Sequence, residues 1–417
     1  MLLHFPTFLL IIGSIVFWLE LWVIRRPEGH TSPLAPIIAM IVLLYFIVRN
    51  GAALRQRAME IQKRWRGLTV SLKLFFSALA LGLFGVLAMS IYSGLLPLHM
   101  VQEGDALNYH YTIPRQHLIL HSFAHLSWST VDLFTLPVQF ALSPYWFATP
   151  FPNKIPQLFF LFGWLGLIFK RAARRDLVSQ SFAAGFLAFC AATASHGFAI
   201  QFGTGMLDLP FCYLIIAALD SYLDGRFVLA AIESAYFIWA KFPILYVLVF
   251  AALWLAAVLL RRSSFTLTMG FEKRPTDRAL PRRYWIGLAL ASLFIAGPFW
   301  FKSLYYSGTP LFPFKVGIVT PWSAIGRARL PAFQKAAATL WTSVDRHHND
   351  FSLRNWATHF FVLAVPTQGV NNPFDYPMGL PYLIFLGPFL FYLAQALRRR
   401  AAPILPLFVV ICCARSC

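Results

Sequence analysis

The chain has 417 residues, of which 59% are hydrophobic and only 12% are charged, and its formal net charge is +19. Soluble proteins have about 25% charged residues, and half that share cannot cover a water-exposed surface of this size. The composition therefore excludes an ordinary soluble protein and predicts an integral membrane protein. The excess of Lys and Arg is explained by membrane topology, so no nucleic-acid partner is expected.

Apolar runs along the chain predict an all-α polytopic membrane protein with roughly ten to eleven membrane-spanning helices. The runs lie near 6–24, 34–48, 74–97, 155–169, 178–200, 207–222, 227–240, 243–260, 285–301, 380–397 and 402–414. A further run at 130–148 is interrupted by Pro137 and Pro144, so we expect it to lie in the membrane interface or to re-enter from one side.

Basic residues predict the orientation of these helices, because cytoplasmic loops are enriched in Lys and Arg. Four basic clusters fall on the same side when the spans alternate: 49–73, 170–175, 261–283 and 398–400. That side is predicted to be cytoplasmic, and two long loops, 98–154 and 302–379, then face outward. Arg25 and Arg26 fall on the outward side, against the rule.

A single membrane domain, 1–417, is expected, because no Gly/Ser-rich or Pro-rich linker separates a soluble part. Its predicted parts are N-terminal spans (1–97), a first outer loop (98–154), central spans (155–301), a second outer loop (302–379) and C-terminal spans (380–417). The short last run suggests a truncated C-terminus. The N-terminus lacks a basic segment and a cleavage site, so it is predicted to be a first span. The five cysteines form no CxxC pair, which gives no sign of a zinc site or a disulfide framework.

Polar residues gather at three predicted outer ends of spans. The first group follows the third span and contains Glu103, Asp105, Asn108, Tyr109, His110 and Arg115. If a helix begins at Asp105, then Asn108, Tyr109 and Thr112 share its face, and Pro114 ends or kinks it. The alternative is that Asp105 only caps the helix.

The other two positions are single charges in apolar surroundings. Asp208 stands at the head of a span, where a carboxylate is costly and indicates function, although a helix cap followed by Pro210 is the alternative. Lys241 lies between two apolar runs, as a cation for a phosphate or as a lysine that reaches lipid headgroups. The predicted topology brings Asp105, Asp208 and Lys241 to one face, and we expect them to converge on one cavity there.

Histidines offer a weaker metal-binding signal. His117, His121 and His125 recur every four residues, so a helix would align them, but the triplet contains no carboxylate. His347, His348 and Asp350 lie in a polar segment with no fixed geometry. The sequence thus leaves a divalent metal open and indicates no cofactor. It also lacks a phosphate-binding loop, a dinucleotide-binding glycine pattern and a serine-hydrolase elbow.

Four short segments, in order, resemble the GT-C membrane glycosyltransferases, in particular protein mannosyltransferases and bacterial aminoarabinose transferase-like proteins. The segments are Asp105 to His110 with Pro114 and Arg115, Leu207-Asp208-Leu209, Ala240-Lys241-Phe242, and Ser307 to Phe314. Residues 371–400 continue the likeness loosely. The chain departs from the family's motifs at Ala240, where the family has Gly or Thr, and at Thr309, where it has Asn.

The resemblance implies a GT-C-like helical bundle that transfers a sugar from a polyprenyl-phosphate donor to a glycan, lipid or protein acceptor. The protein would lie in the bacterial inner membrane with its site on the extracytoplasmic side. The chemistry requires a carboxylate base, for which Asp105 is the candidate, with Glu103 as its substitute or neighbour. Lys241 would stabilise the leaving phosphate, and Asp208 would orient the acceptor, hold a metal or pair with Lys241. Asn108, Tyr109, His110 and Arg115 would bind substrate.

Two other functions remain open. A transporter or flippase of a lipid-linked saccharide or small solute would have inverted repeats and charges at mid-membrane. A non-catalytic membrane protein would retain the GT-C-like fold without activity.

Overall fold

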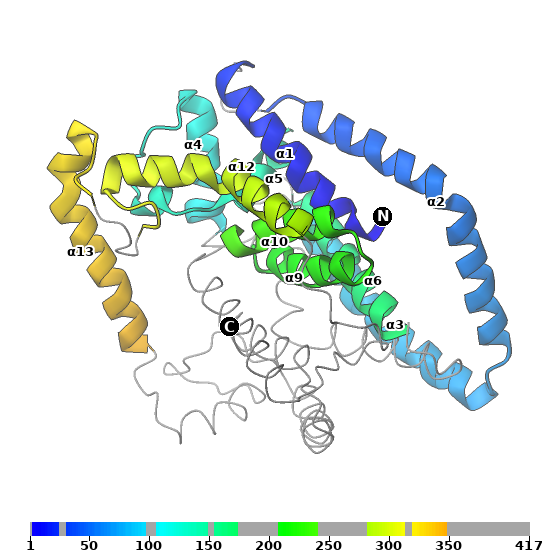
Figure 1. The fold of residues 1–417 in the computed structure, drawn as a ribbon. Helices are drawn as coiled ribbons and strands as arrows, with labels where there is room; N and C mark the ends of the chain where they lie inside the picture. Colours follow the sequence, from blue (N-terminus) through cyan, green and yellow to red (C-terminus); the bar gives the residue numbers. More distant parts are fainter. Residues whose placement is uncertain are drawn as a thin grey trace, which may run out of the picture. The chain divides into compact units, whose positions relative to one another are not determined.

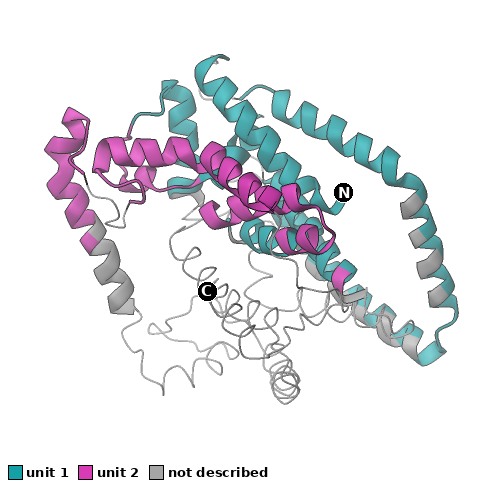
Figure 2. Ribbon diagram, viewed as in Figure 1, with its two compact units in different colours: residues 1–124, 137–170, 199–217 teal, residues 125–136, 171–198, 218–417 magenta. Residues whose placement is uncertain are grey.

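The computed structural model describes residues 2–24, 31–96, 106–148, 154–173, 207–240, 282–312 and 319–347 (Figure 1). Every regular element in these segments is helical, which confirms the all-α prediction for the part described. The chain divides into two compact units. Unit 1 comprises 1–124, 137–170 and 199–217, and unit 2 comprises 125–136, 171–198 and 218–417 (Figure 2).

Unit 1 is built mainly from helices of the N-terminal half, both long and short. These helices are η1 (Leu2–His4), α1 (Phe5–Trp22), α2 (Leu34–Arg66), α3 (Val70–Leu95), the π-helix η4 (Ala106–Tyr111), α4 (Thr112–Leu120) and α5 (Pro137–Trp146). Most of α6 (Ile155–Ala173) and the first part of α9 (Asp208–Leu223) also belong to this unit.

The core of unit 1 is the close antiparallel packing of α1 against α5. The Tyr145 hydroxyl donates to the Leu9 carbonyl over 2.9 Å, and the Phe17 and Phe140 rings meet edge to face at 5.1 Å. Between these contacts α1 carries Gly13, and a Cβ atom there would overlap the backbone carbonyl of Ala141. The absence of a side chain at this position thus allows the two backbones to approach each other.

Unit 2 contains η5 (Thr130–Leu133), the ends of α6 and α9, α10 (Phe227–Ala240), α12 (Arg282–Ser307) and α13 (Ala324–His347). Helices α10 and α12 pack side by side and run in the same direction. The Arg283 guanidinium lies 4.8 Å from the Phe227 ring centroid near the start of both helices. Toward their ends, the Trp239 and Trp300 rings meet at 4.5 Å. Two parallel helices require the chain between them to return to the starting side.

Two glycines end helices with a left-handed backbone, which glycine adopts without a Cβ clash. Gly225 has a φ of 74° between α9 and α10, and the Arg226 N–H there donates to the Ser221 carbonyl. Gly308 has a φ of 77° directly after α12, and its N–H donates to the Leu304 carbonyl. The turn at Gly225 separates two helices that the apolar runs predict, whereas Gly308 is followed by α13, a helix within the predicted outer loop 302–379 that the apolar runs did not predict.

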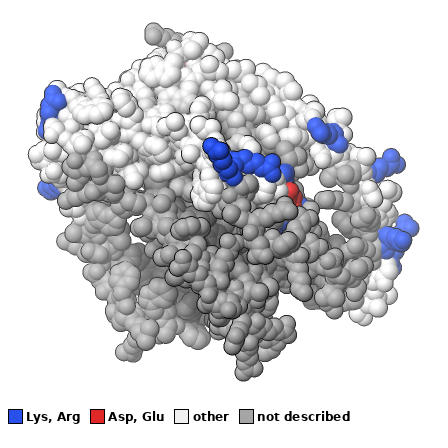
Figure 3. Space-filling view, in the orientation of Figure 1, with Lys and Arg blue, Asp and Glu red and all other residues white. Residues whose placement is uncertain are grey.

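The described helices expose large apolar side chains, as a protein surrounded by lipid requires. Val48 on α2 is 81% exposed, Leu81 on α3 is 73% exposed and Leu290 on α12 is 62% exposed. On the face drawn in Figure 3, Lys and Arg side chains stand at a few separate places on a largely uncharged described surface. Among the residues that the structure describes, three helical segments are long and apolar enough to cross a bilayer: Leu2–Trp22, Leu34–Ala52 and Arg282–Ser307.

The predicted runs and the observed helices agree closely in some regions and differ in others. The runs at 207–222 and 227–240 coincide with α9 and α10, which are short apolar helices. The run at 34–48 is extended to Arg66 in α2, and the run at 130–148 forms η5 and the ten-residue α5, all of whose residues are buried. Full burial within the protein argues against a lipid-facing helix at 137–146. The runs at 178–200, 243–260, 380–397 and 402–414 lie outside the described residues.

Candidate functional site

The first predicted site segment begins as a helix, but not as the α-helix expected. Residues Ala106–Tyr111 form the π-helix η4, whose hydrogen bonds join residues five apart, so the face expected for Asn108, Tyr109 and Thr112 does not apply. Pro114 does not end the helix, because α4 continues to Leu120. Pro114 has no N–H to donate to the His110 carbonyl. It lies in the first turn of α4, directly after the π-helix, where a proline is tolerated. Asp105, Glu103 and the Asn108 side chain lie outside the description.

Two aromatic residues of this segment pack onto the buried helix α5. His110 is 2% exposed, and its Nδ1 atom donates to the Gln139 Oε1 atom over 3.0 Å, while its ring meets the Tyr109 ring at 4.2 Å. The Tyr111 ring stacks on Trp146 with centroids 4.2 Å apart. His110 and Tyr111 are thus held against α5, and Tyr109 contacts the His110 ring.

From Trp146 the polar contacts continue to the start of α6. The Trp146 Nε1 atom donates to the Gln157 Oε1 atom over 3.4 Å. Because indole is a donor only, this contact sets the orientation of the Gln157 amide and leaves its NH₂ group to point elsewhere. That Nε2 atom is buried and has no acceptor among the described residues, and the same holds for the Gln139 Nε2 atom.

Two basic residues belong to the same part of unit 1. Lys154 is fully buried, and its carbonyl accepts the Gln157 N–H over 3.0 Å in the first turn of α6. Arg115, a predicted substrate-binding residue, has its guanidinium 5.9 Å from the centroid of the Phe147 ring, next to Trp146. Of the predicted substrate-binding residues, Arg115 therefore lies at the surface, whereas His110 is buried.

Asp208 lies at a helix end, as its sequence suggests. It is the first residue of α9, and the Phe211 N–H donates to the Leu207 carbonyl there. Helix α10 is described as far as Ala240, the residue before Lys241. The Asp208 side chain and all of Lys241 lie outside the description, so the expected convergence of Asp105, Asp208 and Lys241 stays a prediction.

Unit 2 contains a buried charged cluster that the sequence reasoning missed. The Lys302 Nζ atom donates to the Asp132 Oδ1 atom over 2.5 Å, and both residues are less than 5% exposed. The other oxygen, Asp132 Oδ2, accepts the Leu126 N–H over 2.7 Å and lies 3.2 Å from His125 Nδ1. Lys302 itself was the signal that could have revealed this cluster. It follows the apolar run 285–301, and a charge at the end of such a helix is rarely buried without a partner.

His125 in this cluster has the arrangement of a carboxylate-oriented histidine, but it is enclosed. Its Nε2 atom is buried without a hydrogen-bond partner among the described residues, and its ring lies against Tyr306 and Phe333 at 5.6 and 5.3 Å. Enclosure by aromatic rings favours a structural role. The cluster, which we call the Lys302 ion pair, joins η5 to the end of α12.

The metal site considered for the histidine triplet is not formed as predicted. Helix α4 ends at Leu120, and His121 adopts a left-handed φ of 44°, so one helix does not align the three rings. Among the described residues, no group of three His, Cys, Asp or Glu side chains is placed to hold a metal ion. His347 is the last residue of α13, and His348 and Asp350 lie outside the description.

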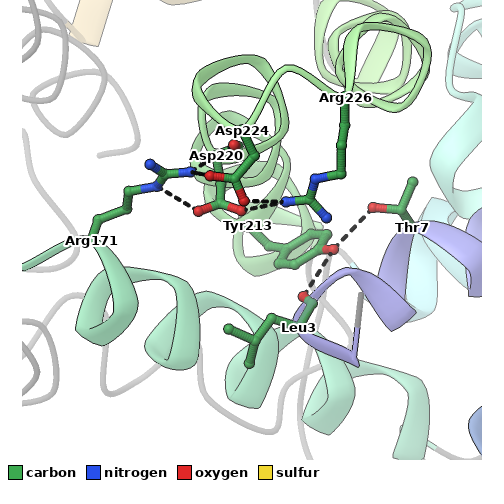
Figure 4. Close-up of polar contacts among 7 residues, drawn as sticks. All are labelled: Leu3, Thr7, Arg171, Tyr213, Asp220, Asp224 and Arg226. Carbon is green, nitrogen blue, oxygen red and sulfur yellow. Dashed lines mark hydrogen bonds and ion pairs between the residues drawn. The ribbon is translucent and has the colours of Figure 1, made fainter. Parts of the chain in front are cut away.

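A second charged cluster in unit 2 joins α6 to the α9–α10 turn (Figure 4). Arg171 donates to Asp220 over 2.5 Å and to Asp224 over 2.7 Å, and Arg226 contacts the same two carboxylates over 2.8 and 3.0 Å. Two cations and two carboxylates neutralise each other, so the role of this arginine–aspartate cluster is to hold α6 against the α9–α10 turn. Figure 4 also shows the Tyr213 hydroxyl of unit 1, which contacts the Thr7 hydroxyl and the Leu3 carbonyl.

No model of a known protein family, no curated protein and no solved structure matches the chain. The function must therefore be argued from the residues themselves.

Proposed function

We propose that the protein is a membrane glycosyltransferase that moves a sugar from a polyprenyl-phosphate donor to an extracytoplasmic acceptor. The observation that carries the proposal is the position of two of the motif segments at helix ends within the described residues. Helix α9 begins at Asp208, and α12 ends at Ser307, directly before the left-handed Gly308. Functional groups at the ends of membrane helices lie where a lipid-linked phosphate and a water-soluble acceptor can meet.

Three features of unit 2 agree with the predicted orientation of the segments that they join. The parallel packing of α10 and α12 agrees with a return crossing near 243–260. The arginine–aspartate cluster joins two segments that are both predicted to be cytoplasmic. The Lys302 ion pair, together with the contact of Arg329 to the Ser127 carbonyl, joins the two predicted outer loops.

In this proposal, Asp105 removes the proton from the acceptor hydroxyl, with Glu103 as its substitute or neighbour. Asp208 orients the acceptor, and Lys241 stabilises the phosphate as it leaves. Asn108, Tyr109, His110 and Arg115 bind substrate, and the packing of His110 on α5 supports a fixed position for this segment. The protein would act in the bacterial inner membrane on its outer side.

A transfer assay tests the proposal. Purified protein is incubated with radiolabelled polyprenyl-phosphate sugars and an extract of envelope acceptors, and the labelled product is counted. Asp105→Asn should lower the rate by about 10²- to 10⁴-fold, because a positioned base contributes that much and the amide keeps the shape. Lys241→Ala should weaken both donor binding and turnover. Full activity of a folded Asp105→Asn protein would end the assignment of the base.

Labelling of single cysteines tests the topology. A cysteine placed at position 270 should be protected from a membrane-impermeant maleimide in intact cells, whereas one at position 320 should react. Labelling at position 270 with protection at position 320 would reverse the orientation and contradict an extracytoplasmic site.

A transporter of a lipid-linked saccharide is the second candidate. Glu233 favours it, because this carboxylate in the middle of the apolar helix α10 is fully buried, and ionisable groups at membrane depth often serve transport. Movement of a labelled lipid-linked saccharide across vesicles, lost in Glu233→Gln and unaffected in Asp105→Asn, would favour the transporter over the transferase.

A further inference from the structure

Helix α12 exposes large apolar side chains along one side. Leu290, Phe294 and Phe301 are each more than half exposed. They lie at positions i, i+4 and i+11, which share one side of an α-helix. The most apolar stretch of this helix is only 17% buried within the protein, although the helix is long enough to cross a bilayer. This side of α12 therefore suits contact with lipid.

The lipid-facing side of α12 continues onto the segment that leads into α13. The Phe301 and Trp322 ring centroids are 6.1 Å apart, and both residues are more than half exposed. The Trp322 and Ser323 N–H groups both donate to the Tyr305 carbonyl over 3.1 Å, which fixes this segment on the last turn of α12. Tryptophan is enriched at the boundary between lipid and water, because its ring is apolar and its indole N–H is polar. Trp322 thus occupies the position of an interfacial anchor.

Helix α13 has an apolar flank that begins beside Trp322. Ile325, Ala328 and Ala332 lie at positions i, i+3 and i+7, so they share this flank. Ile325 is more than half exposed, and Ala328 and Ala332 are exposed as well. The protein therefore leaves this flank open to its surroundings.

The opposite flank of α13 is polar, and the helix is basic. Gln334 follows Ile325 after about two and a half helical turns, which places the two side chains on opposite sides. The stretch 319–344 contains three basic residues, Arg327, Arg329 and Lys335, and no Asp or Glu. An apolar flank, a polar flank and an excess of cations are typical of helices that lie in the surface layer of a membrane.

Two contacts hold α13 in place near the end of α12. The buried Phe333 ring packs on the His125 ring with centroids 5.3 Å apart, and a Cβ atom on Gly326 would overlap the Tyr306 carbonyl. In Figure 1, α13 crosses the direction of α12 instead of continuing it. A helix that crosses the end of a membrane-spanning helix lies along the membrane surface.

We infer that α13 lies on the phospholipid surface of the bilayer, with Trp322 and Ile325 inserted between the lipid headgroups and the acyl chains. Phospholipid is the partner that fits, because the exposed patch continues the lipid-facing side of α12 and the charge around it is positive. The inference goes beyond the proposed function and does not depend on it, since a transporter with this structure would contact lipid in the same way.

Fluorescence quenching tests the inference on the full chain in phospholipid nanodiscs. In a background without the five native cysteines, Trp322→Cys, Ile325→Cys and Gln334→Cys are each labelled with the environment-sensitive dye NBD. A phospholipid with a nitroxide near the headgroup end of its acyl chain should quench the probes at 322 and 325 at least about threefold more strongly than the probe at 334. Gln334→Cys is the matched control, because it lies on the same helix and faces away from the apolar flank.

Aqueous iodide provides the complementary measurement, and it should quench the probe at 334 more strongly than the probe at 325. Equal, weak quenching of both probes by the nitroxide lipid, with iodide reaching both, would place α13 in water and overturn the inference. A probe at 325 that neither quencher reaches would also overturn it, because protein, such as a second copy of the chain, would then cover the patch. If the Ile325→Cys protein does not fold, Ala332→Cys reports on the same flank.

Discussion

The charged clusters of unit 2 and the buried glutamines of unit 1 differ in how their hydrogen-bonding groups are matched. In unit 2, Lys302 faces Asp132, and Arg171 faces Asp220, over 2.5 Å in both cases. In unit 1, Gln139 and Gln157 each bury an amide NH₂ group that has no acceptor among the described residues. Matched charges hold segments of the fold together, whereas these two amide groups contribute through one oxygen contact each.

The largest effect should come from breaking the Lys302 ion pair. Lys302→Met leaves a buried carboxylate without its cation, and Asp132→Asn leaves a buried ammonium without its anion. Each single substitution should lower the free energy of unfolding by about 3–5 kcal/mol, measured by denaturation in mixed micelles. The double variant should recover most of this loss, because neither buried charge then remains, and the amide oxygen introduced at position 132 would still accept the Leu126 N–H.

Additive losses in that double-mutant cycle would contradict the comparison. Additive losses would mean that Lys302 and Asp132 contribute independently to the free energy of unfolding, and that their ion pair does not hold η5 against α12.

The smallest effect should come from the arginine–aspartate cluster. Arg171→Gln removes one of two cations, but Asp220 still contacts Arg226 over 2.8 Å. The Arg171 and Arg226 side chains are also 11% and 24% exposed, so water compensates part of the loss. We expect a loss of about 1 kcal/mol in the free energy of unfolding, by the same denaturation experiment. A loss as large as that of Lys302→Met would show that Asp220 depends on Arg171 alone.

The helices were largely predictable because long apolar runs are a strong local signal. The runs for α9, α10 and α12 located these helices to within about six residues at their ends. The extension of α2 from 49 to Arg66 was missed, because that part is rich in good helix formers but lacks the apolar pattern of a span. Pro144 suggested an interruption, yet it lies inside α5, where tertiary packing outweighs the local preference.

The polar contacts were far less predictable, because they join residues that are distant in sequence. Asp132 and Lys302 are separated by 170 positions, and no local pattern relates them. Lys154 stands directly before an apolar run, and only the fold shows that it is fully buried. His125 fitted a helical histidine pattern, but the chain leaves the helix at His121, so local periodicity misled the interpretation.

The kinetics of sugar transfer test the central claim most directly. Initial rates with a radiolabelled polyprenyl-phosphate sugar are measured over a range of donor concentrations for the wild type, Asp105→Asn and Lys241→Ala. The account predicts that Asp105→Asn lowers kcat with little change in donor KM, and that Lys241→Ala both lowers kcat and raises donor KM. Failure of the folded wild-type protein to transfer sugar from any such donor, or wild-type kinetics in both variants, would contradict it.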